Sequence, residues 1–251
     1  MSLFSKKDIV NYIDKDIEVE IFDKIDSTNT ESLRQLKKGL IKDYKIILAH
    51  EQTNGRGRIG RNFYSPKDNG IYMSIIIPYN DINPLALTAK AAVSVAKSLE
   101  DIIDEKIYIK WVNDLIVDDK KICGILTEGF IDYKTDKLSN IIIGIGINLN
   151  NKNYFIPKDL ENIIKPIDFD KNIDFSKIIA DIFNDIILDY YFLEYYRNNS
   201  YVLNKEIYYI KGDKKIYAKA IDIAKDGSLI VINTQGETVK LNTGEISIRK
   251  L

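Results

Sequence analysis

Two apolar, strand-like runs flank the stretch Thr53-Asn54-Gly55-Arg56-Gly57-Arg58-Ile59-Gly60-Arg61. These nine residues contain three glycines and three arginines. Glycine lets a backbone bend closely around a ligand, and the arginine guanidinium is a planar, permanently charged donor that suits carboxylates and phosphates. The stretch therefore predicts a loop that binds an anionic ligand.

The spacing Gly55-x-Gly57-x-x-Gly60 also matches the dinucleotide-binding fingerprint. That fingerprint requires a helix to begin at the loop, because the pyrophosphate binds at the N-terminus of that helix. Here residues 61–70 have the composition of a loop, and residues 71–77 that of a strand. A Gly-Lys-Ser/Thr sequence at the Walker spacing is also absent. We therefore expect an arginine-rich loop between strands instead of a Rossmann or P-loop site.

Composition narrows the class of protein. The chain has 251 residues, of which 45% are hydrophobic and 29% charged, enough for one domain of ordinary size and a small second one. The net charge of -1 argues against a general nucleic-acid-binding surface. A single cysteine, Cys123, excludes an internal disulfide, and a single histidine, His50, argues against a histidine metal site. Both facts favour a reducing, cytoplasmic setting. With no apolar run of membrane-spanning length, we expect no membrane contact.

The periodicity predicts strands and helices up to about residue 200, followed by a small β-barrel. From about residue 200 the chain contains only short alternating strands, with an Asp-Gly turn at 226–227, as in a barrel of the SH3 type. We expect a larger domain at 1–200 and a barrel domain at 201–251. The predicted strands are 17–22, 44–52, 71–77, a hairpin within 106–129, and 140–150; the predicted helices are 5–15, one after 26–32, 84–99, and 175–198.

Several polar residues lie where strands end. Ser27 and Thr28 stand at a strand-to-helix turn, where they either cap the helix or also offer hydroxyls to a ligand. Gln52 ends a strand and is a candidate ligand contact. Lys121 begins the return strand of the hairpin, where it is either exposed or directed into the concave side of the sheet. Asn148 ends a strand that two glycines interrupt, a sign of close approach by a ligand or another backbone.

Other residues favour structural roles. Trp111, the only tryptophan, is expected in the core, and His50 is expected to be packed and not catalytic. The long polar connection at 151–173 is predicted to form a flexible flap over the site. The glycines and mutually repelling arginines predict that the loop at 54–65 is mobile without ligand and ordered when ligand binds.

Over nearly its whole length the chain resembles a biotin protein ligase. The matching pieces occur in the family's order: Asp26-Ser27-Thr28-Asn29; Gln52 with Gly55-Arg56-Gly57-Arg58-Ile59-Gly60-Arg61; Lys110-Trp111-Val112-Asn113-Asp114-Leu115 with Lys121 and Gly124; Gly144-Ile145-Gly146-Ile147-Asn148; and Gly244-Glu245-Ile246-Ser247-Ile248-Arg249. Two departures stand out. Val112 replaces the family's usual proline, and the chain leaves no room for the N-terminal winged helix-turn-helix of some members, so repression of biotin genes is not implied.

The resemblance implies an α+β fold with a mixed β-sheet backed by helices, in which residues 1–200 form a class II aminoacyl-tRNA synthetase-like catalytic domain. It also implies a two-step ligase reaction. Biotin and MgATP would give biotinyl-5′-AMP and pyrophosphate, and the biotinyl group would pass to a lysine of a biotin carboxyl carrier protein. Mg²⁺ would arrive with ATP, so no resident metal is expected. Arg58 and Lys121 would bind the reacting carboxylate and α-phosphate, Asn148 the adenine, and Asp114 would orient or deprotonate the acceptor lysine.

The family's functional residues carry over position by position. The implied biotin contacts are Ser27, Thr28, Gln52, Gly55, Arg56, Lys121 and Gly124. The implied ATP and adenylate contacts are Arg56, Arg58, Arg61, Trp111, Asn113, Lys121, Asn148 and Arg249. The implied catalytic residues are Arg58, Lys121 and Asp114.

Two alternative functions remain open. A lipoate or octanoate ligase shares the fold and the adenylation chemistry, although the Gly-Arg-Gly-Arg loop and the C-terminal barrel favour biotin. A non-catalytic biotin-binding or nucleic-acid-binding module is the alternative from another class, and the net charge of -1 weighs against DNA as a partner. The resemblance also implies a homodimer formed through a sheet edge.

Overall fold

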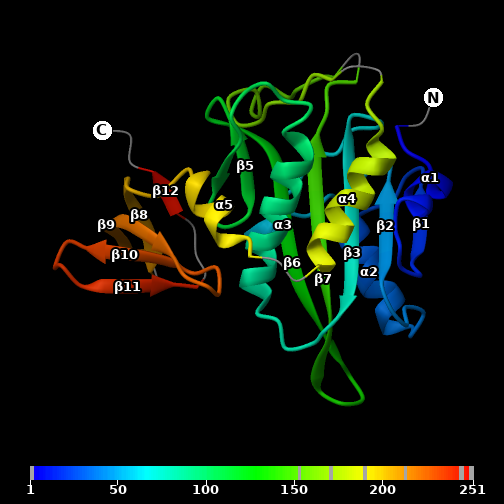
Figure 1. Cartoon of the computed structure of the whole chain (residues 1–251), viewed down its shortest axis with the longest axis horizontal. Helices are drawn as coiled ribbons and strands as arrows, with labels where there is room; N and C mark the ends of the chain where they lie inside the picture. The colour runs from blue at the N-terminus through cyan, green and yellow to red at the C-terminus, as the bar shows by residue number, and fades with distance from the viewer. Residues whose placement is uncertain are drawn as a thin grey trace.

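The computed structural model describes residues 3–151, 154–169, 172–188, 191–211, 214–242 and 246–248. Within these ranges the chain forms a seven-stranded sheet with helices against it, and a smaller five-stranded sheet built by the C-terminal residues (Figure 1). The expected α+β fold is confirmed.

The large sheet has the strand order β1-β2-β3-β7-β6-β5-β4. β1 and β2 are parallel, and every other neighbouring pair is antiparallel. The expected hairpin is formed by β5 and β6, which turn at Asp118 and Asp119, both with positive φ. The strands are β1 (Glu18–Phe22), β2 (Lys45–Ala49), β3 (Gly70–Pro78), β4 (Tyr108–Lys110), β5 (Asp114–Val117), β6 (Lys120–Asp132) and β7 (Lys137–Asn148).

The sheet is buried on both faces. Helices α3 (Pro84–Leu99) and α4 (Phe175–Ile187) cover one face and enclose the main core, while α2 (Thr28–Lys37) covers a smaller core on the other (Figure 1). Successive residues of β3 divide between the two cores: Ile75 joins the main core and Ile76 the smaller one. This explains why β2, β3 and β7 are apolar nearly throughout and do not alternate with polar residues. The first helix, α1 (Lys6–Asn11), contacts α4.

The helix expected over 175–198 is two helices. It begins as predicted, with the Asp174 side chain accepting hydrogen bonds from the backbone N–H groups of Ser176 and Lys177. However, α4 ends at Ile187, and α5 (Leu193–Asn198) follows separately. The Lys90 ammonium donates a hydrogen bond to the Leu188 carbonyl just beyond the end of α4. Because that contact comes from α3, the apolar periodicity of the segment could not reveal the break.

The small sheet confirms the expected run of C-terminal strands. Its order is β11-β10-β9-β8-β12, and all of its pairs are antiparallel. The strands are β8 (Glu206–Lys211), β9 (Lys214–Ile223), β10 (Leu229–Asn233), β11 (Thr238–Leu241) and β12 (Ile246–Ile248). This arrangement agrees with the SH3-like type, whereas the division into domains at residue 200 stays a prediction.

Trp111 joins the two sheets. Its side chain is only 4% exposed, and its indole N–H donates a hydrogen bond of 2.8 Å to the carbonyl of Gly227 in the turn between β9 and β10. A side chain at position 227 would collide with the carbonyl of Leu85, 2.9 Å away. Trp111 is therefore in the core, as expected, and fixes the small sheet against the beginning of α3.

We expect Trp111→Phe to lower the free energy of unfolding by about 1–3 kcal/mol, because it leaves the buried Gly227 carbonyl without its donor. Urea denaturation followed by circular dichroism measures this change. Tyr133→Phe, at a side chain that is 73% exposed, is the matched control and should leave the midpoint unchanged. An unchanged midpoint in Trp111→Phe would show that this hydrogen bond contributes nothing.

No helix in the described part of the chain combines the length and the apolar character that crossing a membrane requires.

Candidate active site

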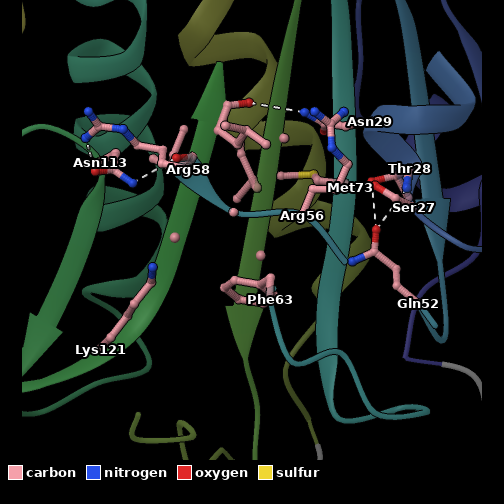
Figure 2. Close-up of a pocket in the computed structure, with 17 residues that line it drawn as sticks. Ser27, Thr28, Asn29, Gln52, Arg56, Arg58, Phe63, Met73, Asn113 and Lys121 are labelled. Atoms are coloured by element: carbon pink, nitrogen blue, oxygen red, sulfur yellow. Dashed lines mark hydrogen bonds between the residues drawn. The ribbon is translucent and has the colours of Figure 1, made fainter. Parts of the chain in front are cut away.

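A cavity that is partly open to solvent lies between the start of α2, the Gly/Arg-rich loop (residues 53–61) and the middle of the large sheet. Figure 2 shows Ser27, Thr28 and Gln52 at one end of the cavity and Arg58, Asn113 and Lys121 at the other; Asn29 and Arg56 are further polar residues of the lining. The cavity therefore suits a ligand with two chemically different ends.

The first end is neutral and tightly hydrogen-bonded. Ser27 is the N-cap of α2, and its side chain accepts from the backbone N–H of Thr30, so the predicted capping role is confirmed. The Thr28 backbone N–H donates to Gln52 Oε1 at 2.9 Å, and Gln52 Nε2 donates to Ser65 Oγ at 2.9 Å. Thr28 is only 3% exposed, so its hydroxyl is held at the bottom of the cavity. Capping and lining the cavity are thus compatible roles of the same turn.

The second end carries two positively charged side chains, Arg58 and Lys121. Arg58 Nη1 donates to Asn113 Oδ1 at 2.9 Å, and Asn113 Nδ2 donates to Asp114 Oδ1 at 3.0 Å. That same carboxylate oxygen lies 2.7 Å from Lys121 Nζ. Lys121 thus points into the concave side of the sheet, and its side chain is 24% exposed. Two cations, one carboxylate and one amide form a continuous chain that an anionic group entering the cavity can contact.

Glycines leave the room between these two ends. A Cβ at Gly146 would lie 2.4 Å from the Phe63 ring, and a Cβ at Gly124 would lie 2.6 Å from Lys121 Nζ. A Cβ at Gly144 would lie 2.1 Å from Asn29 Oδ1. The two glycines in β7 therefore mark close approach, as expected, but in this structure the approaching groups are side chains of the protein.

The Gly/Arg-rich loop is folded back on itself. The Phe63 backbone N–H donates to the Gly55 carbonyl at 2.8 Å, and the Gly57 N–H donates to the Arg61 carbonyl at 2.7 Å. Gly55 is required at its position, because a Cβ there would lie 2.4 Å from the Phe63 carbonyl oxygen. Ile59, at the exposed tip, has a φ of 54°. The expected change from a mobile to an ordered loop stays a prediction.

Arg56 has a protein partner in this structure. Its guanidinium makes a two-point contact with the Glu128 carboxylate, from Nη2 to Oε1 at 2.7 Å and from Nη1 to Oε2 at 3.0 Å. Glu128 lies on β6 and also accepts from Asn29 Nδ2 at 2.9 Å. The loop is thereby tied to β6 and α2 on one side of the cavity.

Most of the predicted site residues come together. The predicted residues that line the cavity are Ser27, Thr28, Gln52, Arg56, Arg58, Asn113, Lys121 and Gly124. Gly55 supports the loop, and Asp114 contacts Lys121. Asn148 is buried at the end of β7, with Nδ2 3.3 Å from the Lys121 carbonyl, outside the cavity lining. Arg61 is exposed outside the lining, and Arg249 lies outside the described residues.

Trp111 is a predicted nucleotide contact that lies outside the lining of this cavity. Its buried indole donates a hydrogen bond to the Gly227 carbonyl of the small sheet. The contact of Trp111 with the nucleotide stays a prediction.

Sequence reasoning missed four residues: Asn29, Phe63, Ser74 and Glu128. Asn29 and Phe63 line the cavity, and Ser74 and Glu128 contact Asn29 from β3 and β6. Only Asn29 carried a signal, as the neighbour of Thr28 in the turn. The other three are revealed by contacts between distant segments.

Burial raises the pKa of the Cys123 thiol, so this residue of β6 stays protonated and is a poor nucleophile.

Two family models match the chain. The model described as the Biotin/lipoate A/B protein ligase family matches residues 21–148, and the Biotin protein ligase C terminal domain matches residues 202–249. The first match covers the cavity, and the second covers the small sheet.

Two curated relatives share the name bifunctional ligase/repressor BirA. The protein from Bacillus spizizenii is 36% identical over 147 residues, which is 57% of this chain and 44% of that protein. The protein from Escherichia coli is 27% identical over 266 residues, which is 99% of this chain and 79% of that protein. The chain thus spans less than half of the length of the Bacillus relative.

Solved structures show the same fold. The biotin protein ligase from Aquifex aeolicus, in complex with biotin and ATP, superimposes with a TM-score of 0.72 at 25% identity. That match covers 93% of this chain and 99% of the Aquifex chain, so it includes both sheets.

Proposed function

We propose, from the membership of this chain in the biotin/lipoate A/B protein ligase family, that it is a biotin–protein ligase. It activates biotin with MgATP to biotinyl-5′-AMP and then transfers the biotinyl group to a lysine of a biotin carboxyl carrier protein. The Aquifex aeolicus structure supports this proposal, because that protein is a biotin protein ligase in complex with biotin and ATP.

The two-ended cavity is the observation that carries the choice of substrate. Biotin has a neutral ureido head with two N–H donors and one carbonyl, and a carboxylate at the end of an aliphatic chain. The Thr28 and Gln52 end matches the head, and the Arg58 and Lys121 end matches the carboxylate. The dithiolane ring of lipoate offers no hydrogen bond to the first end and would leave buried polar groups unpaired.

The adenylation step requires two anions to meet. The biotin carboxylate attacks the α-phosphorus of ATP, the bond to the leaving pyrophosphate breaks, and the acyl–phosphate bond of biotinyl-5′-AMP forms. Mg²⁺ bound to the ATP phosphates offsets part of their negative charge. Arg58 and Lys121 stabilise the remaining charge around the reacting atoms. Asn113 holds the Arg58 guanidinium in place through its 2.9 Å hydrogen bond.

Transfer then replaces AMP by an amine. The neutral ε-amine of the acceptor lysine attacks the acyl carbonyl, AMP leaves, and an amide forms. Asp114 is the carboxylate at this end of the cavity, and we assign it to orienting or deprotonating the acceptor lysine. We assign Arg61, Asn148 and Arg249 to the nucleotide. These four roles are parts of the proposal.

Partners and setting complete the proposal. The partner is a biotinyl acceptor domain, and the chain forms a homodimer through a sheet edge; β1 and β4 are the outermost strands of the large sheet. Sedimentation velocity tests the dimer. The cytoplasm is the proposed location. The nucleic-acid-binding alternative requires salt-dependent retention on DNA, which a ligase does not.

Ligand selectivity tests the substrate. In calorimetric titrations we expect biotin to bind at least a hundredfold more tightly than lipoate or octanoate, because only biotin pairs with the Thr28 and Gln52 end of the cavity. Tighter binding of lipoate or octanoate would favour a lipoate or octanoate ligase instead. Absence of binding by all three acids would contradict the proposed activity itself.

A further inference from the structure

Ser74 lies at the centre of a hydrogen-bond chain that the catalytic steps do not use. Its side chain is fully buried in β3, and its Oγ lies 2.6 Å from Asn29 Oδ1 and 2.8 Å from Thr28 Oγ1. Thr28 faces the cavity, whereas Ser74 is absent from the cavity lining. Ser74 therefore acts on a ligand only through Thr28 and Asn29, which both line the cavity.

The orientation of the Asn29 amide is fixed by its neighbours. Asn29 Nδ2 lies 2.9 Å from Glu128 Oε2 and 3.4 Å from the Leu126 carbonyl oxygen. An ionised carboxylate and a carbonyl can only accept hydrogen bonds, so the amide NH₂ must face them. The amide oxygen of Asn29 is thereby turned toward Ser74.

Counting protons then fixes the direction of the whole chain. An amide oxygen cannot donate, so the 2.6 Å contact to Asn29 uses the single proton of the Ser74 hydroxyl. The 2.8 Å contact between Ser74 and Thr28 must then use the proton of the Thr28 hydroxyl. Thr28 Oγ1 also lies 3.3 Å from Gln52 Oε1, but its proton is already committed to the shorter contact. Thr28 therefore presents lone pairs, and no proton, to the cavity.

The Gln52 amide is fixed in the same way. Its oxygen accepts from the Thr28 backbone N–H at 2.9 Å, a group that can only donate. Its nitrogen donates to Ser65 Oγ, and that hydroxyl donates onward to the Phe63 carbonyl at 3.0 Å. Thr28 Oγ1 and Gln52 Oε1 are thus both held as acceptors.

We propose that Ser74, Asn29 and Glu128 are positioning residues that hold Thr28 as a hydrogen-bond acceptor, so that the cavity selects ligands with two N–H donors, one for Thr28 and one for Gln52. The inference rests on the proposed function and specifies how the ureido ring is distinguished from rings without N–H groups. Gly144 makes the chain feasible, because a Cβ there would lie 2.1 Å from Asn29 Oδ1.

The chain also extends to the Gly/Arg-rich loop. Glu128 binds Asn29 and the Arg56 guanidinium with the same carboxylate, and Oε2 contacts both. A movement of Arg56 therefore changes the contacts of Glu128, which orients the Asn29 amide. This connects the Gly/Arg-rich loop with Thr28, the acceptor for a ureido N–H group.

Ser74→Ala tests the inference with three ligands: biotin and its two mono-N-methyl ureido isomers. In the wild-type protein we expect one isomer, the one whose methyl group replaces the N–H facing Thr28, to bind much more weakly than biotin. In Ser74→Ala the Thr28 hydroxyl can turn away from its acceptor role. The dissociation constant of that isomer divided by the dissociation constant of biotin should then fall about tenfold, the effect of one hydrogen bond. Calorimetry measures all three constants in each protein.

Two controls keep the outcomes distinct. Ser94→Ala removes another fully buried serine hydroxyl, bonded to the Lys90 carbonyl within α3, and should leave the ratio unchanged. Glu128→Ala is the alternative variant if Ser74→Ala fails to fold, because Glu128 is more exposed than Ser74. Its removal frees the Asn29 amide and should also lower the ratio. Equal weakening of biotin and both isomers would mean a purely structural role for Ser74 and overturn the inference. Absence of biotin binding in the wild-type protein would overturn the proposed function instead.

Discussion

Replacing Arg58 by alanine is expected to slow biotin-dependent pyrophosphate exchange by about a thousandfold. Two unit charges of the same sign about 4 Å apart repel by roughly 4 kcal/mol at an effective dielectric constant near 20, and that energy corresponds to about three powers of ten in rate. Arg58 lies at the cationic end of the cavity, where Asn113 fixes its guanidinium. Exchange of labelled pyrophosphate into ATP measures the loss directly.

Lys38→Ala is the matched control for this prediction. It removes one positive charge from an exposed position beyond the end of α2, so exchange should stay at the wild-type rate. Biotin binding should weaken much less than exchange in Arg58→Ala, because the repulsion is greatest when the phosphate is also present. Exchange within about twofold of wild type would show that Arg58 does not stabilise the reacting anions.

Gly146→Ala is expected to weaken biotin binding by about tenfold or more. The new Cβ would lie 2.4 Å from the Phe63 ring, which has to move into the cavity or lift the Gly/Arg-rich loop. Overpacking of this kind costs about 1–3 kcal/mol. Calorimetric titration of biotin measures the loss, and thermal unfolding separates it from a general loss of stability.

Gly129→Ala provides the corresponding control in the neighbouring strand. Its added Cβ would meet Leu138 Cδ1 at 2.6 Å, the end of a flexible side chain that can turn away. Biotin binding should therefore stay at the wild-type level. If Gly146→Ala binds biotin as tightly as Gly129→Ala does, Phe63 does not form a fixed wall of the site.

The elements of the fold could be predicted where local signals were strong. Pro84 in the first turn marks the start of α3, Asp174 caps α4, and the Asp-Gly turn at 226–227 separates β9 from β10. The break between α4 and α5 could not be predicted, because Lys90 contacts that point from another helix. Local periodicity has no access to such contacts.

The candidate site was predictable only in part. Motifs located Thr28, Gln52 and Lys121, and the structure brings all three to one cavity. Ser74 and Glu128 have no motif of their own, since a serine in an apolar strand and a glutamate in a hairpin strand are ordinary residues. Their roles depend on contacts with Asn29 across 45 and 99 residues of sequence.

Trp111 shows how residues of one short motif can take different places in the fold. The resemblance placed it among the nucleotide contacts, because it lies in the same short motif as Asn113 and Asp114. In the structure the Asn113 amide lines the cavity, while the indole of Trp111 donates to the small sheet. The nucleotide contact of Trp111 stays a prediction.

Pyrophosphate exchange by the purified wild-type chain, with biotin, lipoate or octanoate added singly to MgATP, tests the central claim most directly. Exchange reports formation of the acyl-adenylate and needs no acceptor protein. The two-ended cavity predicts rapid exchange with biotin and none above background with the other two acids. Exchange with lipoate or octanoate but not with biotin, or with none of the three, would contradict the assignment as a biotin–protein ligase.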